Sequence, residues 1–148
     1  MSDLTQTYDI AAPRAEVFRA LTEPAVLDRW WTTSSESDPR PGGAFVYTWE
    51  FDDAARNHVQ SGEYRELEDG RLVSYPWAAG GETLVSFRLE DADGGTRLTL
   101  EHTGFPDDAG RDHHDQGWAG FLNNLRSVLT GGADQRAEMM GLKVRAPR

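Results

Sequence analysis

Residues 117–129 place apolar side chains at the spacing of one helix face, with polar side chains between them. After Trp118, apolar residues follow at three, four, seven, ten and eleven positions, which forms one continuous stripe on an α-helix. Because such a stripe must be buried against another element, the helix requires a partner surface elsewhere in the chain. The stripe consists of Trp118, Phe121, Leu122, Leu125, Val128 and Leu129.

The partner surface is predicted to be a β-sheet, since six upstream segments alternate apolar and polar residues. Gly80-Gly81 and Gly94-Gly95 separate later segments and indicate hairpin turns, so neighbouring strands are expected to run antiparallel. One phase of these strands is rich in aromatic side chains. The expected strands are residues 4–10, 44–51, 59–67, 72–78, 82–90 and 96–103.

Two short helices are expected between the first and second strands. Pro13 fits the first turn of a helix over residues 14–21, because its missing N–H has no partner there. Pro24 is expected to begin a second helix that runs through Trp31, and residues 32–43 are predicted to form a loop.

The order of these elements predicts an α+β fold in which a six-stranded antiparallel sheet wraps around a long C-terminal helix. The long helix is expected to begin near Asp112, after a loop that starts at residue 104. We expect residues 1–130 to form one domain. Residues 131–148 contain few apolar side chains and are expected to form an extension, weakly ordered or a short helix.

Charge and composition argue against several classes of function. The 148 residues carry a formal net charge of −10, whereas nucleic acid and anionic membranes require a basic surface. No apolar run approaches the roughly 20 residues that span a bilayer, so no membrane insertion is expected. The chain has no cysteine, and its first residues lack the pattern of a secretory signal. We therefore expect a cytoplasmic protein.

The aromatic residues of sheet and helix make either a packed core or the lining of a cavity. Buried tyrosine and tryptophan need hydrogen-bond partners for their polar tips, and aliphatic side chains interdigitate more readily. The chain contains a single isoleucine, Ile10, although a packed core would favour aliphatic residues. Burial of each ring would itself stabilise the fold by roughly 1.5–3 kcal/mol, so the residues alone leave both alternatives open.

An ordered set of short motifs runs through about residues 4–130. The motifs are Ala11-Ala12-Pro13, Val17-Phe18, Ala20-Leu21-Thr22-Glu23-Pro24, Leu27, Trp30-Trp31, Asp38-Pro39-Arg40-Pro41-Gly42-Gly43, Gly62, Leu72, Thr96-Arg97-Leu98-Thr99-Leu100, His102 and Gly117-Trp118. Together they resemble the START-like superfamily, also called SRPBCC or helix-grip proteins. The similar branch is the one named for the activator of the ATPase of the 90-kDa heat-shock chaperone.

This resemblance implies a sheet that grips the long helix with a cavity between them, which favours the hollow alternative. Members of the superfamily bind lipids, polyketides, flavonoid-like molecules and hormones, and some catalyse cyclisation or dehydration. We therefore predict that the chain binds a small hydrophobic or aromatic ligand between sheet and helix. The predicted lining is Trp49, Tyr64, Tyr75, Trp77, Phe87, His102, Trp118 and Phe121.

Histidines are the candidates for chemistry in the cavity. His102 has the inward phase of its strand, where it could act as a general acid or base or make structural hydrogen bonds; we favour the structural role. His113 and His114 lie among acidic residues, but adjacent histidines on a helix project about 100° apart and do not easily reach one ion. We interpret this cluster as a helix cap, and we expect no metal and no other cofactor.

No catalytic motif is present, so we assign no catalytic residue and regard an enzyme as the less favoured alternative. A cyclase or dehydratase would use His102 with a tyrosine in the same cavity. A co-chaperone, with a role in the stress response, would use the outer surface instead, although no residue pattern supports docking to a chaperone. A homodimer is compatible with the sequence. Of Trp30 and Trp31, one is expected to pack in the core and its neighbour to cover the rim.

Overall fold

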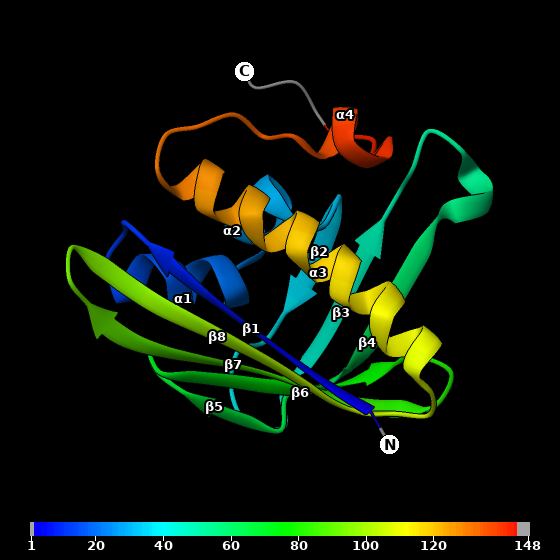
Figure 1. The fold of residues 1–148 in the computed structure, drawn as a ribbon, viewed down its shortest axis with the longest axis horizontal. Helices are drawn as coiled ribbons and strands as arrows, with labels where there is room; N and C mark the ends of the chain where they lie inside the picture. Colours follow the sequence, from blue (N-terminus) through cyan, green and yellow to red (C-terminus); the bar gives the residue numbers. More distant parts are fainter. Residues whose placement is uncertain (1, 145–148) are drawn as a thin grey trace.

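The structure, a computed structural model, describes residues 2–144. Figure 1 shows the long helix α3 (Asp108–Leu129) lying across the strands, with both short N-terminal helices beside it. These two helices are α1 (Arg14–Thr22) and α2 (Pro24–Trp30). The predicted α+β helix-grip architecture is confirmed.

The strands form two antiparallel sheets rather than the single six-stranded sheet expected. The larger sheet has five strands in the order β1 (Ser2–Ile10), β8 (Gly95–Phe105), β7 (Glu82–Ala92), β6 (Leu72–Ala78) and β5 (Glu66–Glu68). The smaller sheet has the order β2 (Ser34–Ser37), β3 (Ala44–Trp49) and β4 (His58–Glu63). A short 3₁₀ helix, η1 (Ala54–Arg56), lies in the connection between β3 and β4.

Two strand predictions are corrected. Residues 59–67 do not form one strand, because the chain passes from the smaller to the larger sheet at Tyr64. The backbone of Tyr64 pairs with Gly42 and Gly43, whereas the next amide, that of Arg65, donates to Ser74 in β6. Within the loop predicted over residues 32–43, β2 pairs with β3 through its backbone. Its four residues are all polar, so no apolar alternation marked it.

The long helix begins at Asp108, four residues before the position expected from the sequence. Asp107 caps this end, because its Oδ1 accepts a hydrogen bond of 2.7 Å from the backbone N–H of Gly110. The additional turn places His113 and His114 in the second turn of the helix, where both line the pocket beside the strands.

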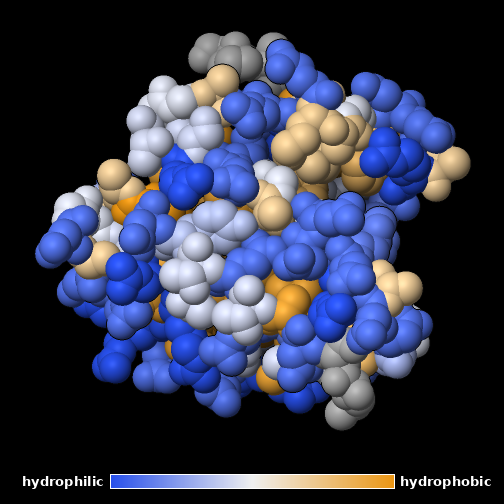
Figure 2. All heavy atoms as spheres, viewed as in Figure 1, coloured by the Kyte–Doolittle hydropathy of each residue, from blue (hydrophilic) through white to orange (hydrophobic). Residues whose placement is uncertain are grey.

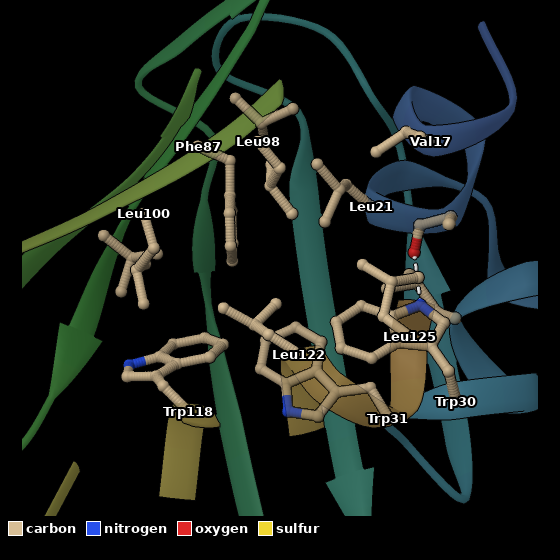
Figure 3. Close-up of a cluster of buried hydrophobic side chains, with 14 of the residues drawn as sticks. Val17, Leu21, Trp30, Trp31, Phe87, Leu98, Leu100, Trp118, Leu122 and Leu125 are labelled. Atoms are coloured by element: carbon tan, nitrogen blue, oxygen red, sulfur yellow. Dashed lines mark hydrogen bonds between the residues drawn. The ribbon is translucent and has the colours of Figure 1, made fainter. Parts of the chain in front are cut away.

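A core of apolar side chains joins α1, α3 and the larger sheet (Figure 3). Leu122 and Leu125 come from the predicted stripe of α3, and Leu21 of α1 lies beside them. The Trp30 ring is fully buried next to Leu125, and its Nε1–H donates to the carbonyl oxygen of Ala20 at 2.7 Å. This end of the molecule is a packed interior.

The chain continues past α3 into a short helix, α4 (Arg136–Met140), near the far end of the β3–β4 hairpin (Figure 1). Arg136 is 2% exposed and pairs with Asp134. Its guanidinium also donates to the carbonyl oxygens of Asp28 at 2.9 Å and Thr32 at 2.8 Å. A buried cation therefore fastens this segment to the end of α2.

The face of the molecule seen in Figure 2 is mostly hydrophilic, with apolar residues scattered among polar ones. Among the described residues, no helix combines the length and the apolarity that crossing a membrane requires.

Candidate functional site

A pocket of about 500 Å³ lies between the N-terminal half of α3 and the β3–β4 hairpin. In Figure 1 these elements are the yellow half of α3 and the strands at the right. The lining residues come from the end of α2, the hairpin, β6 and α3: Trp31, Trp49, Phe51, Arg56, His58, Trp77, Ala78, His113, His114, Gly117, Trp118 and Phe121. A second hollow of about 320 Å³, on the larger sheet, has a mostly charged lining and shares no residue with this pocket.

Strand alternation positions the β-sheet wall of the pocket. Trp49 is the last residue of β3 and Trp77 lies near the end of β6, and both face inwards with ring centroids 5.8 Å apart. Phe51 follows β3 and is held by a bridge to Leu142, so the segment after α4 fixes this part of the wall. The Arg56 guanidinium lies over the Phe51 ring, 4.4 Å from its centroid.

Trp31 occupies the inner end of the pocket. Its ring stacks on Trp30 at 5.3 Å and on Trp77 at 5.6 Å, and it also contacts Trp49 and Trp118 at 5.3 and 5.2 Å. Trp31 is 2% exposed. As expected for this pair, Trp30 packs in the core, but Trp31 lies deep in the site and does not cover its rim.

The eight predicted lining residues are divided between the pocket and the core. Those that line the pocket are Trp49, Trp77, Trp118 and Phe121. Those that lie outside its lining, buried in the core, are Tyr64, Tyr75, Phe87 and His102. Contact between any of the eight and a ligand stays a prediction.

Two of the buried tyrosines, Tyr47 and Tyr64, satisfy their hydroxyl groups within the core. The hydroxyl groups of Tyr47 and Tyr64 are 2.6 Å apart, and Ser37 Oγ lies 2.6 Å from that of Tyr64. Burial raises the pKa of Tyr47 and Tyr75 well above the ordinary value for tyrosine. These tyrosines therefore stay protonated, and the end of the aromatic set that contains them is packed.

His102 links α3 to the larger sheet through a directional chain of hydrogen bonds. The Trp118 indole N–H can only donate, so His102 Nδ1, at 3.0 Å, is the acceptor and the ring proton is on Nε2. His102 Nε2–H then donates to Thr83 Oγ1 at 2.6 Å, and Thr83 donates to the carbonyl oxygen of Trp77 at 2.7 Å. Burial lowers the pKa of His102 to about 3, so the ring is neutral. Both ring nitrogens are occupied, which supports the structural role.

The comparisons with known proteins agree with this geometry. Residues 11–130 match the family described as Activator of Hsp90 ATPase homolog 1-like protein. The chain belongs to this family. The START-like resemblance seen in the sequence is thereby confirmed, whereas no curated protein matches the chain.

Several solved structures share the fold of this chain. A crystal structure of a Mesorhizobium loti protein has a TM-score of 0.75 and 24% identity, covering 89% of this chain and 99% of that one. The solution structure of the Aha1 dimer from Colwellia psychrerythraea has a TM-score of 0.72 and 22% identity, covering 87% and 96%. A Staphylococcus saprophyticus protein has a TM-score of 0.70 and 19% identity, covering 99% and 98%. At these identities the likeness concerns the fold.

Some lining residues of this family member were not predicted from the sequence. Arg56 and His58 lie on the β3–β4 hairpin, and no local pattern indicates that the hairpin folds over the helix. His113 and His114 were interpreted as part of a helix cap, and the earlier start of α3 places them on the lining. Gly117 belongs to the Gly117-Trp118 motif, which was a signal that could have identified it.

Burial and hydrogen bonding define the state of two histidines at the pocket, His58 and His114. Burial lowers the pKa of His58 and of His114 below the ordinary value for histidine. His114 Nδ1 lies 2.8 Å from the carbonyl oxygen of Gly110, which fixes a proton on that nitrogen. Within residues 2–144, no three histidine or carboxylate side chains converge to hold a metal ion.

Two polar atoms beside the pocket have no partner. The indole nitrogens of Trp49 and Trp77 are buried, and no acceptor among the described residues lies within hydrogen-bond distance of either. A buried donor without an acceptor costs about 1–3 kcal/mol. Two unsatisfied donors therefore lie beneath the aromatic wall of the pocket.

Proposed function

We propose that this protein binds a small hydrophobic or aromatic ligand in the pocket between α3 and the β3–β4 hairpin. The observation that carries the proposal is an aromatic-lined space of about 500 Å³, within the roughly 300–1,000 Å³ range of small-molecule sites. The rings of Trp49, Trp77, Trp118 and Phe121 would provide apolar contact area for a planar ligand.

Gly117 allows the proposal to be tested without disturbing the core. It lies on the pocket side of α3, is exposed, and a Cβ built on it meets no atom within 4 Å. Leucine at this position would therefore project into open space while improving helix propensity. The variant Gly117→Leu should keep the fold and obstruct the pocket.

The test is a titration with N-phenyl-1-naphthylamine, a neutral aromatic probe, followed by probe emission and tryptophan quenching. We expect saturable binding to the wild type, nearly unchanged binding to Gly117→Ala, and at least about tenfold weaker binding to Gly117→Leu, because a buried leucine side chain displaces about one ring of ligand. Equal binding by all three proteins, or no binding by the wild type, would contradict the proposal.

The proposal also covers the cellular location of the protein and its possible protein partners. The cysteine-free composition supports a cytoplasmic location, and the family match leaves a chaperone partner and a role in the stress response as the rival function. A solved structure of the same fold is a dimer, which supports testing for a homodimer. Stimulation of a chaperone ATPase by both wild type and Gly117→Leu would favour the rival, because that activity would not need the pocket.

A further inference from the structure

The β-sheet side of the pocket is rich in hydrogen-bond donors and poor in acceptors. The indole N–H groups of Trp49 and Trp77 are buried beside it without an acceptor. An indole nitrogen can only donate, so neither group can be satisfied by another donor. The two nitrogens themselves are covered by protein atoms, so a ligand oxygen must be met by donors that the pocket exposes.

His58 adds a third donor on the same wall. Gln60 accepts from the backbone N–H of Ala78 at 3.0 Å and donates to its carbonyl oxygen at 2.8 Å, which fixes the orientation of its amide. The Gln60 amide nitrogen lies 3.0 Å from His58 Nε2, which must then be the acceptor. The neutral His58 ring therefore carries its proton on Nδ1, and that nitrogen has no partner among the described residues.

Arg56 gives the wall a positive charge. Its guanidinium donates to the carbonyl oxygen of Met140 at 3.0 Å and lies over Phe51, but forms no ion pair with a carboxylate of residues 2–144. The lining contains no aspartate and no glutamate, although the whole chain has 25 of them. Acidic residues are therefore abundant in the chain but do not line the pocket.

We infer that the pocket takes an aromatic molecule that carries a carboxylate or a similar anionic oxygen group, with that group directed towards the β3–β4 hairpin. This inference rests on the proposed function and narrows the class of ligand that the pocket binds. The anionic oxygens accept from Arg56 and His58, while the rings of Trp118 and Phe121 on α3 cover the apolar part of the molecule.

An aromatic lining would also suit an organic cation, which is attracted to the faces of tryptophan rings. A cation, however, would meet the guanidinium of Arg56 and would give the Nδ1–H of His58 no acceptor. The donor-rich lining therefore favours an anion over a cation.

A neutral and an anionic probe with the same ring skeleton separate the effect of ligand charge on binding from the effect of ligand shape. 1-Anilinonaphthalene-8-sulfonate differs from N-phenyl-1-naphthylamine by one anionic sulfonate, and thioflavin T serves as a cationic aromatic dye. Titrations are made at about 0.15 M ionic strength, where screening over about 8 Å reduces the general repulsion of anions by the acidic surface. We expect the sulfonate to bind the wild type about tenfold more tightly than the neutral probe, because a charge-assisted hydrogen bond is stronger than a neutral one.

Arg56 variants test the role of the guanidinium. Arg56→Gln should weaken sulfonate binding about tenfold, and by clearly more than it weakens binding of the neutral probe, while Arg56→Lys keeps the charge and should retain most of the affinity. Arg29 is exposed on α2 and lies outside the lining, so Arg29→Gln is the matched control for loss of one charge. Near-UV circular dichroism checks that each variant is folded.

The outcomes distinguish this inference from the proposed function. If the neutral probe binds and Gly117→Leu blocks it, the proposed function stands. The inference nevertheless falls if the sulfonate binds no more tightly, if Arg56→Gln has the effect of Arg29→Gln, or if thioflavin T binds best. Sulfonate binding that persists in Gly117→Leu lies outside the pocket and also overturns the inference. Absence of binding by all three probes overturns both.

Discussion

At the scale of single residues, His102 acts as a connection between elements. It accepts from Trp118 on α3 and donates to Thr83 on β7, and it has no exposed surface. A protonated ring could no longer accept from the indole, so the Trp118 bond requires the neutral form. Because Trp118 lines the pocket, the neutral ring of His102 helps to hold one of the lining side chains in place.

This arrangement predicts a loss of stability in acid. The pKa of His102 is about 3 in the folded protein, against about 6.5 in the unfolded chain, so below pH 6.5 the unfolded state binds the additional proton. The free energy of unfolding should therefore fall as the pH decreases from about 6.5 to 3, by up to about 1.4 kcal/mol per pH unit from this group. Urea denaturation across this range measures the slope.

The matched variant is His102→Gln, which keeps a donor and an acceptor but does not titrate. His58 contributes to both proteins, so the difference between the two slopes reports on His102 together with its interaction with His114. Parallel pH profiles for the two proteins would contradict the assignment.

At the scale of elements, the segment that follows α3 is held by Arg136 and supports one wall of the pocket. The guanidinium lies in the interior next to the end of α2, and Asn124 of α3 joins it by donating to the Asp134 carboxylate at 3.1 Å. Beyond α4, Leu142 bridges to Phe51 and Met140 accepts from Arg56. Loss of Arg136 should therefore affect both stability and the pocket.

We predict that Arg136→Ala lowers the free energy of unfolding by about 2–3 kcal/mol, because it leaves the carbonyl oxygens of Asp28 and Thr32 without their charged donor. Arg136→Lys should recover part of this, since an ammonium group lacks the planar fork that reaches three acceptors. Arg29→Ala, which removes an exposed arginine of α2, should stay within about 0.5 kcal/mol of the wild type. Urea denaturation midpoints compare the three, and equal losses in Arg136→Ala and Arg29→Ala would refute the role of the buried cation.

At the scale of the whole molecule, the two sheets approach each other where Gly62 of β4 faces β6. A Cβ built on Gly62 would lie 3.2 Å from the Phe45 ring and 3.2 Å from Pro76. A larger side chain must therefore move a packed ring or separate the sheets, and it has no open space to enter. This close approach explains why the glycine lies inside a strand.

Gly62→Val should accordingly destabilise the fold by about 1–3 kcal/mol, the usual cost of overpacking a close contact. Gly81 provides the control, because it lies in the exposed β6–β7 turn and a Cβ there meets nothing within 4 Å. We expect Gly81→Val to change the free energy of unfolding by less than about 0.5 kcal/mol. Thermal unfolding followed by circular dichroism tests the pair, and a stable Gly62→Val protein would show that the sheets can separate freely.

Local patterns predicted most elements, because most strands here are bounded by turns and alternate clearly. Residues 72–78 form β6 as expected, since turns close the alternation at both ends. By contrast, β2 is polar and depends on backbone pairing with β3, and the passage of Tyr64 between sheets has no periodic signal. Tertiary pairing decides such cases, and a single sequence does not encode it locally.

The sequence predicted which side chains of a strand face inwards, but not which of these inward side chains line the pocket. Strand phase indicates which side of a strand a ring faces, and it placed both Trp77 and Tyr75 inwards. It does not indicate which part of the helix a ring faces, so Trp77 reaches the pocket while Tyr75 lies in the packed core. The position of η1 and Arg56 beside the pocket depends on contact with Met140 of α4, which is far from them in the sequence.

The position of Trp31 has a spectroscopic consequence. All five tryptophans of the chain form one continuous ring cluster: Trp31 contacts Trp30, Trp49, Trp77 and Trp118. With the Trp30 and Trp77 planes within 15° of that of Trp31, their electronic transitions couple, and absorbed energy migrates among neighbouring indoles. A ligand that quenches one of these indoles should therefore also reduce the emission of its neighbours, so intrinsic tryptophan fluorescence can report binding without a label.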